Sequence, residues 1–143
     1  MPRVKLELPE HFPFSMEIVV RITDLNYGGH VGNDRIPAYM QEARVAFLNK
    51  YGYSELDVEG VSLIMSDCQI VFKGEGFYGD IISIEVAAVE FHKYGFNLYY
   101  RMQKQSGQLV AEASSNMMCF DYKNRKLLSL PEQAKLKLEQ GRW

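Results

Sequence analysis

Residues 24–34 combine side chains and backbone groups that suit chemistry at a carbonyl. The segment holds two acids, two amides, one imidazole and three glycines. A glycine-rich turn before a helix leaves backbone N–H groups without intrahelical partners, and such donors can bind a polarised oxygen. The imidazole of His30 can accept or donate a proton near neutral pH. The segment is therefore a candidate site.

The flanking sequence is predicted to hold this turn between a strand and a long helix. Residues 16–22 are rich in Ile and Val, which predicts a strand. From residue 36 to residue 51, apolar residues recur at spacings of four, three, four and four, the pattern of one helix face. Pro37 suits the first turn of this helix, and Gly52 suits its end.

The second half of the chain is predicted to form an antiparallel meander. Short glycine-containing turns separate four segments with the composition or alternation of strands, and a short helix follows. These segments are residues 61–72, 81–91, 95–105, 109–122 and, for the helix, 132–140. The order predicts an α+β fold in which a five- to six-stranded antiparallel sheet wraps around one long central helix. Exposed sheet edges predict dimerisation by edge pairing.

Composition narrows the class of protein. A chain of 143 residues with 47% hydrophobic and 24% charged residues predicts a single globular domain over residues 1–143. The net charge of −2 argues against nucleic-acid binding. We expect no membrane partner, because neither a signal sequence nor a spanning segment is evident. Two cysteines predict a cytoplasmic protein with reduced thiols. The histidines show no metal-ligand spacing, so neither metal nor cofactor is expected.

Three segments resemble the 4-hydroxybenzoyl-CoA thioesterase-like family of hotdog-fold acyl-CoA thioesterases. Residues 24–33 are similar to the family's D-x-D-x-x-G-H-V-N-N turn, and residues 39–44 to its Y-x-x-E-A-R helix segment. Residues 72–80 resemble the turn ending in G-D after the second strand. The resemblance implies a hotdog fold that hydrolyses the thioester of acyl-CoA or acyl-carrier-protein substrates. The resemblance also implies a homodimer, or a homotetramer formed by two such dimers.

One position departs from the family pattern. The family's second Asp serves as nucleophile or general base, and this chain has Asn26 there. An amide cannot accept a proton as a carboxylate does, so the family mechanism does not transfer directly. Plant acyl-carrier-protein thioesterases resemble this chain in a His at the position of His30 and a catalytic Glu that matches Glu75. The resemblance therefore implies Glu75 as the replacement carboxylate.

The resemblance also assigns roles within the turn. The backbone N–H of Asn33 is expected to stabilise the oxyanion, although its side chain also suits a helix N-cap. Asn26, His30, Asn33 and Glu75 are therefore the expected catalytic residues. Asp24, Tyr27, Gly29 and Asp34 are expected to bind substrate.

Most of these residues also have a structural interpretation. Asp24 and Asn26 suit turn stabilisation, and His30 suits a structural imidazole that forms a hydrogen bond with the glycine-rich turn. Asp34 suits the positive end of a helix dipole, and Glu75 suits a solvated turn. Two further hypotheses concern other parts of the chain. Cys68 is expected to be a small buried core residue, and Glu42 and Arg44 a buried polar pair.

Two other functions stay open at this point. A hotdog enoyl-CoA hydratase has a D-x-N-P-x-H motif that Asp24, Asn26 and His30 partly match, but Tyr27 replaces the Pro and the His is one residue late. A non-catalytic acyl-CoA-binding hotdog protein would explain Asn26. The acyl group is undetermined, because it depends on which strand residues among Leu63, Met65, Phe72 and Met117 face inward.

Overall fold

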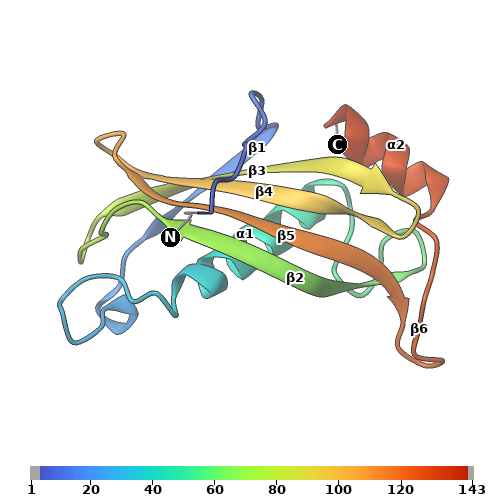
Figure 1. Cartoon of the computed structure of the whole chain (residues 1–143), viewed down its shortest axis with the longest axis horizontal. Helices are drawn as coiled ribbons and strands as arrows, with labels where there is room; N and C mark the ends of the chain where they lie inside the picture. Colours follow the sequence, from blue (N-terminus) through green and yellow to red (C-terminus); the bar gives the residue numbers. More distant parts are fainter. Residues whose placement is uncertain (1–3, 142–143) are drawn as a thin grey trace.

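The computed structural model describes residues 4–141, which form one antiparallel sheet with a long helix against one face (Figure 1). The strands are β1 (Phe14–Val19), β2 (Ser62–Phe72), β3 (Ile81–His92), β4 (Gly95–Lys104), β5 (Leu109–Asp121) and β6 (Lys126–Leu127). The helices are η1 (Ile22–Asp24), α1 (Ile36–Lys50) and α2 (Glu132–Gln140). The strand order is β1-β3-β4-β5-β2, and β6 pairs with β5. The expected six-stranded antiparallel arrangement is confirmed.

The core lies between α1 and the inner face of the sheet. Every second residue of β5 from Ala111 to Cys119 is buried, as expected for a strand with one covered face. Phe47 and Leu48 of α1 are fully buried, and the Phe47 ring meets Phe14 of β1 edge to face at 5.8 Å between centroids. The apolar stripe predicted for this helix therefore anchors it to the sheet.

The helix boundaries agree with the sequence pattern, but the first strand differs. Helix α1 ends at Lys50, and Gly52 follows with a φ of +80°, the left-handed conformation that favours glycine. Strand β1 ends at Val19 instead of residue 22, because η1 follows it. The Asp24 carboxylate accepts a hydrogen bond from the Arg21 N–H at 3.0 Å, and this local bond competes with extension of the strand.

Two predictions about the helix side of the sheet were wrong. Cys68 is exposed, because it lies on the edge strand β2 while α1 packs against β1 and β3. Glu42 is also exposed and does not pair with Arg44. The guanidinium of the buried Arg44 contacts the carboxylate of Glu55 instead, since Glu55 lies in the segment that returns beneath the helix toward β2.

The N-terminal arm crosses the face of the sheet opposite α1 (Figure 1). The guanidinium of Arg101 on β4 lies 4.8 Å from the ring centroid of Phe12, which fixes the arm to this face. Within residues 4–141, no helix has the length and apolar character needed to cross a membrane.

Candidate active site

Two segments far apart in the sequence meet at the N-terminal end of α1. The Val31 N–H donates to the Gly76 carbonyl at 2.8 Å, which ties the glycine-rich turn to the loop between β2 and β3. Gly76 is buried, and a Cβ atom there would lie 3.0 Å from Val31 Cγ2. Glycine permits this close approach without strain, whereas a side chain here would require Val31 to move by a few tenths of an ångström. The contact brings Glu75 next to the turn that carries His30.

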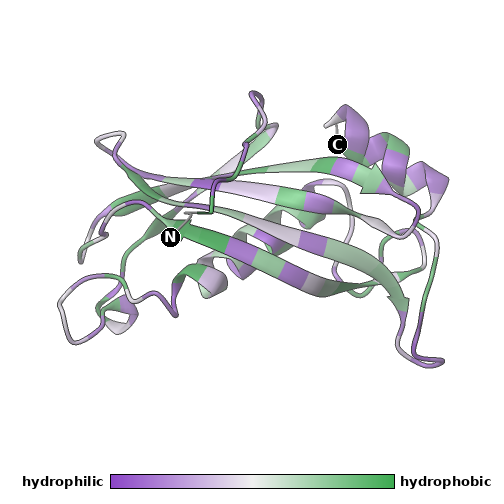
Figure 2. Ribbon diagram, in the orientation of Figure 1, coloured by the Kyte–Doolittle hydropathy of each residue, from purple (hydrophilic) through white to green (hydrophobic). Residues whose placement is uncertain are grey.

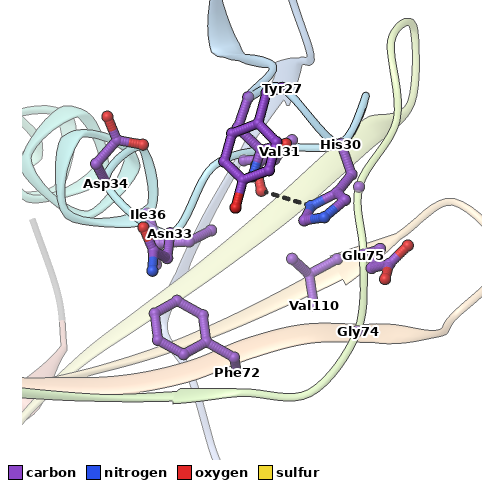
Figure 3. A pocket seen from close by; sticks show the side chains of 12 residues that line it. Tyr27, His30, Val31, Asn33, Asp34, Ile36, Phe72, Gly74, Glu75 and Val110 are labelled. Atoms are coloured by element: carbon purple, nitrogen blue, oxygen red, sulfur yellow. Dashed lines mark hydrogen bonds between the residues drawn. The ribbon is translucent and has the colours of Figure 1, made fainter.

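A cavity of about 480 Å³ opens where these segments meet (Figure 3). It combines polar groups from the turn and loop with apolar side chains from α1, β2 and β5. Its lining residues are Asn26, Tyr27, His30, Val31, Asn33, Asp34, Ile36, Phe72, Gly74, Glu75, Gly76 and Val110. All four expected catalytic residues therefore line one cavity. An apolar wall beside a few polar groups is the usual make-up of a small-molecule site.

The turn that leads into α1 has unpaired donors at this cavity. The backbone N–H groups of Asn33 and Asp34 make no hydrogen bond to any described residue, whereas the Arg35 N–H donates to the Gly32 carbonyl at 2.9 Å. The N-cap is Arg35 and has no side-chain cap bond. The interpretation of Asn33 as the N-cap is therefore wrong, because the helix starts two residues later. The free N–H groups and the helix dipole can stabilise negative charge on a bound oxygen.

Asn26 and His30 face each other across Gly28. The Asn26 Oδ1 accepts the Gly28 N–H at 2.9 Å, so its amide nitrogen is left to donate. The His30 Nδ1 lies 3.1 Å from the Val31 carbonyl oxygen. Because a carbonyl oxygen only accepts, Nδ1 carries the hydrogen in the neutral ring, and Nε2 is an acceptor. Asn26 is thus a donor and His30 a proton acceptor.

Glu75 lines the same cavity from the opposite side to the helix start. Its side chain is exposed and forms no hydrogen bond or ion pair with a described residue. In Figure 3 its carboxylate points away from Asn33. A rotation about its side-chain bonds, which an exposed glutamate can make at low cost, is needed to bring the carboxylate over the cavity.

The expected substrate-binding residues are divided between two locations. Tyr27 and Asp34 line the cavity and are exposed, whereas Asp24 and Gly29 do not line it. The Asp24 carboxylate instead accepts the Tyr39 hydroxyl of α1 at 2.8 Å. Burial, followed by this hydrogen bond, raises the pKa of Tyr39 above its ordinary value, which keeps the phenol as the donor. Asp24 therefore fixes the turn to the helix.

Sequence reasoning did not identify the apolar wall formed by Val31, Ile36 and Val110. The helical periodicity of residues 36–51 indicates that Ile36 faces inward. Val110 directly follows a predicted turn, and nothing in the sequence places it beside β2. No group of three His, Cys, Asp or Glu side chains within the described residues is arranged to hold a metal ion.

The sequence profile of the thioesterase-like superfamily matches residues 20–138. The chain belongs to this superfamily. The long-chain acyl-CoA thioesterase FadM of Escherichia coli K12 is 26% identical over 126 residues, which cover 87% of this chain and 96% of FadM. The prediction of a thioesterase from the turn, helix and loop motifs is thus confirmed at the level of the family.

Solved structures of the same fold include other thioesterases. The 1,4-dihydroxy-2-naphthoyl-CoA thioesterase Slr0204 of Synechocystis superposes with a TM-score of 0.78 at 22% identity, over 87% of this chain and 93% of that chain. The DHNA-CoA thioesterase of Staphylococcus aureus superposes with a TM-score of 0.79 at 19% identity, over 88% and 90%. At these identities they establish the hotdog fold. The superfamily match and the similarity to FadM favour hydrolysis over the hydratase alternative.

Proposed function

We propose that this protein hydrolyses acyl-CoA thioesters in the cavity at the start of α1. The observation that carries the proposal is that the unpaired N–H groups of the turn before α1, His30 and Glu75 lie at one apolar-walled cavity. Thioester hydrolysis needs donors for the developing oxyanion and a base for the attacking water, and these residues supply both.

In the proposed mechanism the thioester carbonyl oxygen lies against the N–H groups of Asn33 and Asp34, and the Asn26 amide donates a further hydrogen bond. Water approaches the carbonyl carbon from the side of His30 and Glu75. The Glu75 carboxylate takes one proton from this water. The other O–H of the water donates a hydrogen bond to His30 Nε2. The new C–O bond then forms and the C–S bond breaks. The leaving thiolate takes up the proton that Glu75 holds.

The acyl group is proposed to follow the apolar side of the cavity. Phe72 and Ile36 line that side, and FadM acts on long-chain acyl-CoA. An acyl-carrier-protein thioester presents the same bond on the same phosphopantetheine arm, so it is the alternative substrate.

The test is the release of free thiol from a panel of acyl-CoA esters. Replacing Glu75→Gln or His30→Ala is expected to lower kcat by about 100-fold, the usual contribution of a positioned acid or base. Glu139→Gln is the matched control, because Glu139 is an exposed glutamate on α2 and does not line the cavity. Rates in both cavity variants equal to that of the control would remove these role assignments.

We further propose that the whole chain, residues 1–143, works as one cytoplasmic domain and assembles as a homodimer. Strand β2 is a sheet edge of eleven residues, and the middle of this strand, from Met65 to Gln69, is exposed. A long uncovered edge strand invites pairing with another strand. Strand β2 of a second copy satisfies the unpaired backbone groups of this edge. Association of two such dimers gives the homotetramer.

A further inference from the structure

Apart from tyrosine hydroxyl groups, two polar side chains are buried in the interior of the described chain. Arg44 on α1 is 7% exposed, and Ser115 on β5 is fully buried. They are joined through the buried Tyr100 of β4, whose hydroxyl lies 3.2 Å from Arg44 Nη1 and 2.8 Å from Ser115 Oγ. These three residues, with Glu55 paired to Arg44, form one polar cluster under the helix.

This polar cluster reaches a second cavity, of about 250 Å³, between α1 and the edge strand β2. Arg44, Met40 and Pro37 line it from the helix, and Met65 and Cys68 line it from the strand. Met65 and Cys68 are three residues apart but share a face, because a β-bulge interrupts the register between Met65 and Asp67.

The second cavity lies along the same strand, β2, as the first, and the two cavities have no lining residue in common. Phe72 lines the catalytic cavity and Cys68 the second cavity, and both belong to the helix side of the strand. The four residue steps from Cys68 to Phe72 span about 13 Å, the length of a chain of about ten carbon atoms. The strand is apolar at its catalytic end and mixed in polarity further along (Figure 2). An acyl chain that started at Asn33 and passed Ile70 on the helix side of β2 would reach the polar cluster.

The polar cluster has hydrogen-bonding capacity left over. Arg44 uses Nε for Glu55 and Nη1 for Tyr100, and Nη2 makes no hydrogen bond to a described residue. A buried ion pair adds little to stability compared with apolar side chains of similar size, so packing alone does not explain its presence beside a cavity. Because Glu55 balances the charge of Arg44, the free donor suits a neutral oxygen better than a second carboxylate.

Building on the proposed function, we propose that Arg44 is a specificity residue that selects acyl groups carrying a neutral oxygen, a hydroxyl or keto group, at their distal end. Tyr100 and Ser115 position its guanidinium. A plain alkyl chain of the same length leaves this donor desolvated and unpaired, which lowers its binding in the transition state.

The direct test compares three substrates of the wild-type enzyme. Butyryl-CoA is too short to reach the polar cluster and reports the basic activity. 10-Hydroxydecanoyl-CoA is expected to exceed decanoyl-CoA in kcat/KM by about tenfold, the effect of one hydrogen bond to a charged donor. Equal values, or a preference for decanoyl-CoA, would overturn the specificity proposal. A lack of butyryl-CoA hydrolysis would instead refute the proposed function.

The double variant Arg44→Met, Glu55→Gln removes both charges of the pair together. It is expected to abolish the tenfold preference and leave butyryl-CoA hydrolysis within a factor of about two of the wild type. A retained preference in the folded variant would overturn the role of Arg44. Folding is checked by circular dichroism and a thermal melt.

Alkylation of Cys68 tests the path of the chain without a core substitution. Cys68 is exposed, whereas Cys119 is buried and burial raises the pKa of its thiol to about 11, so N-ethylmaleimide selects Cys68. The modified enzyme is expected to lose about tenfold in kcat/KM on both ten-carbon substrates and to keep its butyryl-CoA activity. Cys68→Ser is the control that the reagent does not affect. Equal effects on short and long substrates would contradict the path.

Discussion

Position 26 separates this chain from the carboxylate chemistry that its turn motif resembles. The Asn26 side chain accepts the Gly28 N–H through Oδ1, so its position is fixed and its remaining group is a donor. A carboxylate could accept the same bond and also act as a base. The amide therefore keeps the turn geometry of the motif, and the proposed mechanism takes its base from Glu75, one of two exposed carboxylates that line the cavity, with Asp34.

This exchange predicts a rescue. Glu75→Gln is expected to be nearly inactive, and adding Asn26→Asp is expected to recover at least about tenfold in kcat, because a carboxylate returns to the cavity at the position of the family's Asp. Thiol release from acyl-CoA measures both variants. Asn26→Ala in the same background is the control, since it removes the amide without adding a base. Recovery in the alanine variant, or none in the aspartate variant, would contradict the exchange.

At the scale of elements, the loop between β2 and β3 must hold Glu75 against the glycine-rich turn. The Val31–Gly76 bond fixes its middle, and Asp80 fixes its end. The Phe77 N–H donates a hydrogen bond to the Asp80 carboxylate at 2.9 Å. This bond is the main reason why the pKa of Asp80 lies below its ordinary value of 3.8. Gln105 and Lys104 act in the same direction.

The lowered pKa of Asp80 fixes the sign of a pH effect. The folded state binds this proton more weakly than the unfolded state, so its contribution to stability is present above about pH 4 and lost as pH falls through the folded pKa. Asp80→Asn is expected to have a lower Tm than wild type at about pH 6, and the gap is expected to narrow toward about pH 3. Thermal melts across this range measure it. A constant gap would show that the charge of Asp80 does not hold the loop.

The elements themselves were largely predictable, and the contacts between them were not. Periodicity predicted α1 and the four long strands because each buries one face at a fixed spacing, as Phe47 and Leu48 illustrate. It did not indicate that α1 packs toward β1 and β3, since that depends on tertiary contacts. Cys68 was therefore assigned wrongly to the core. Glu75 lies in a loop with no periodicity, and only the family resemblance identified it.

At the scale of the whole molecule, the uncovered edge β2 carries the prediction of a homodimer. A two-fold pair of β2 strands brings like residues near one another across the new ladder, and like charges at such positions oppose pairing. Gln69 lies in the exposed middle of β2, so Gln69→Lys is expected to weaken the dimer by about tenfold or more.

Sedimentation velocity over a range of protein concentrations measures the mass. The wild type is expected at twice the chain mass of 16.5 kDa, and the variant is expected to shift toward the mass of one chain. Ser106→Lys adds the same charge at an exposed turn between β4 and β5, away from the edge, and is expected to behave as wild type. A wild-type monomer, or an equal shift in both variants, would mean that this edge is not the interface.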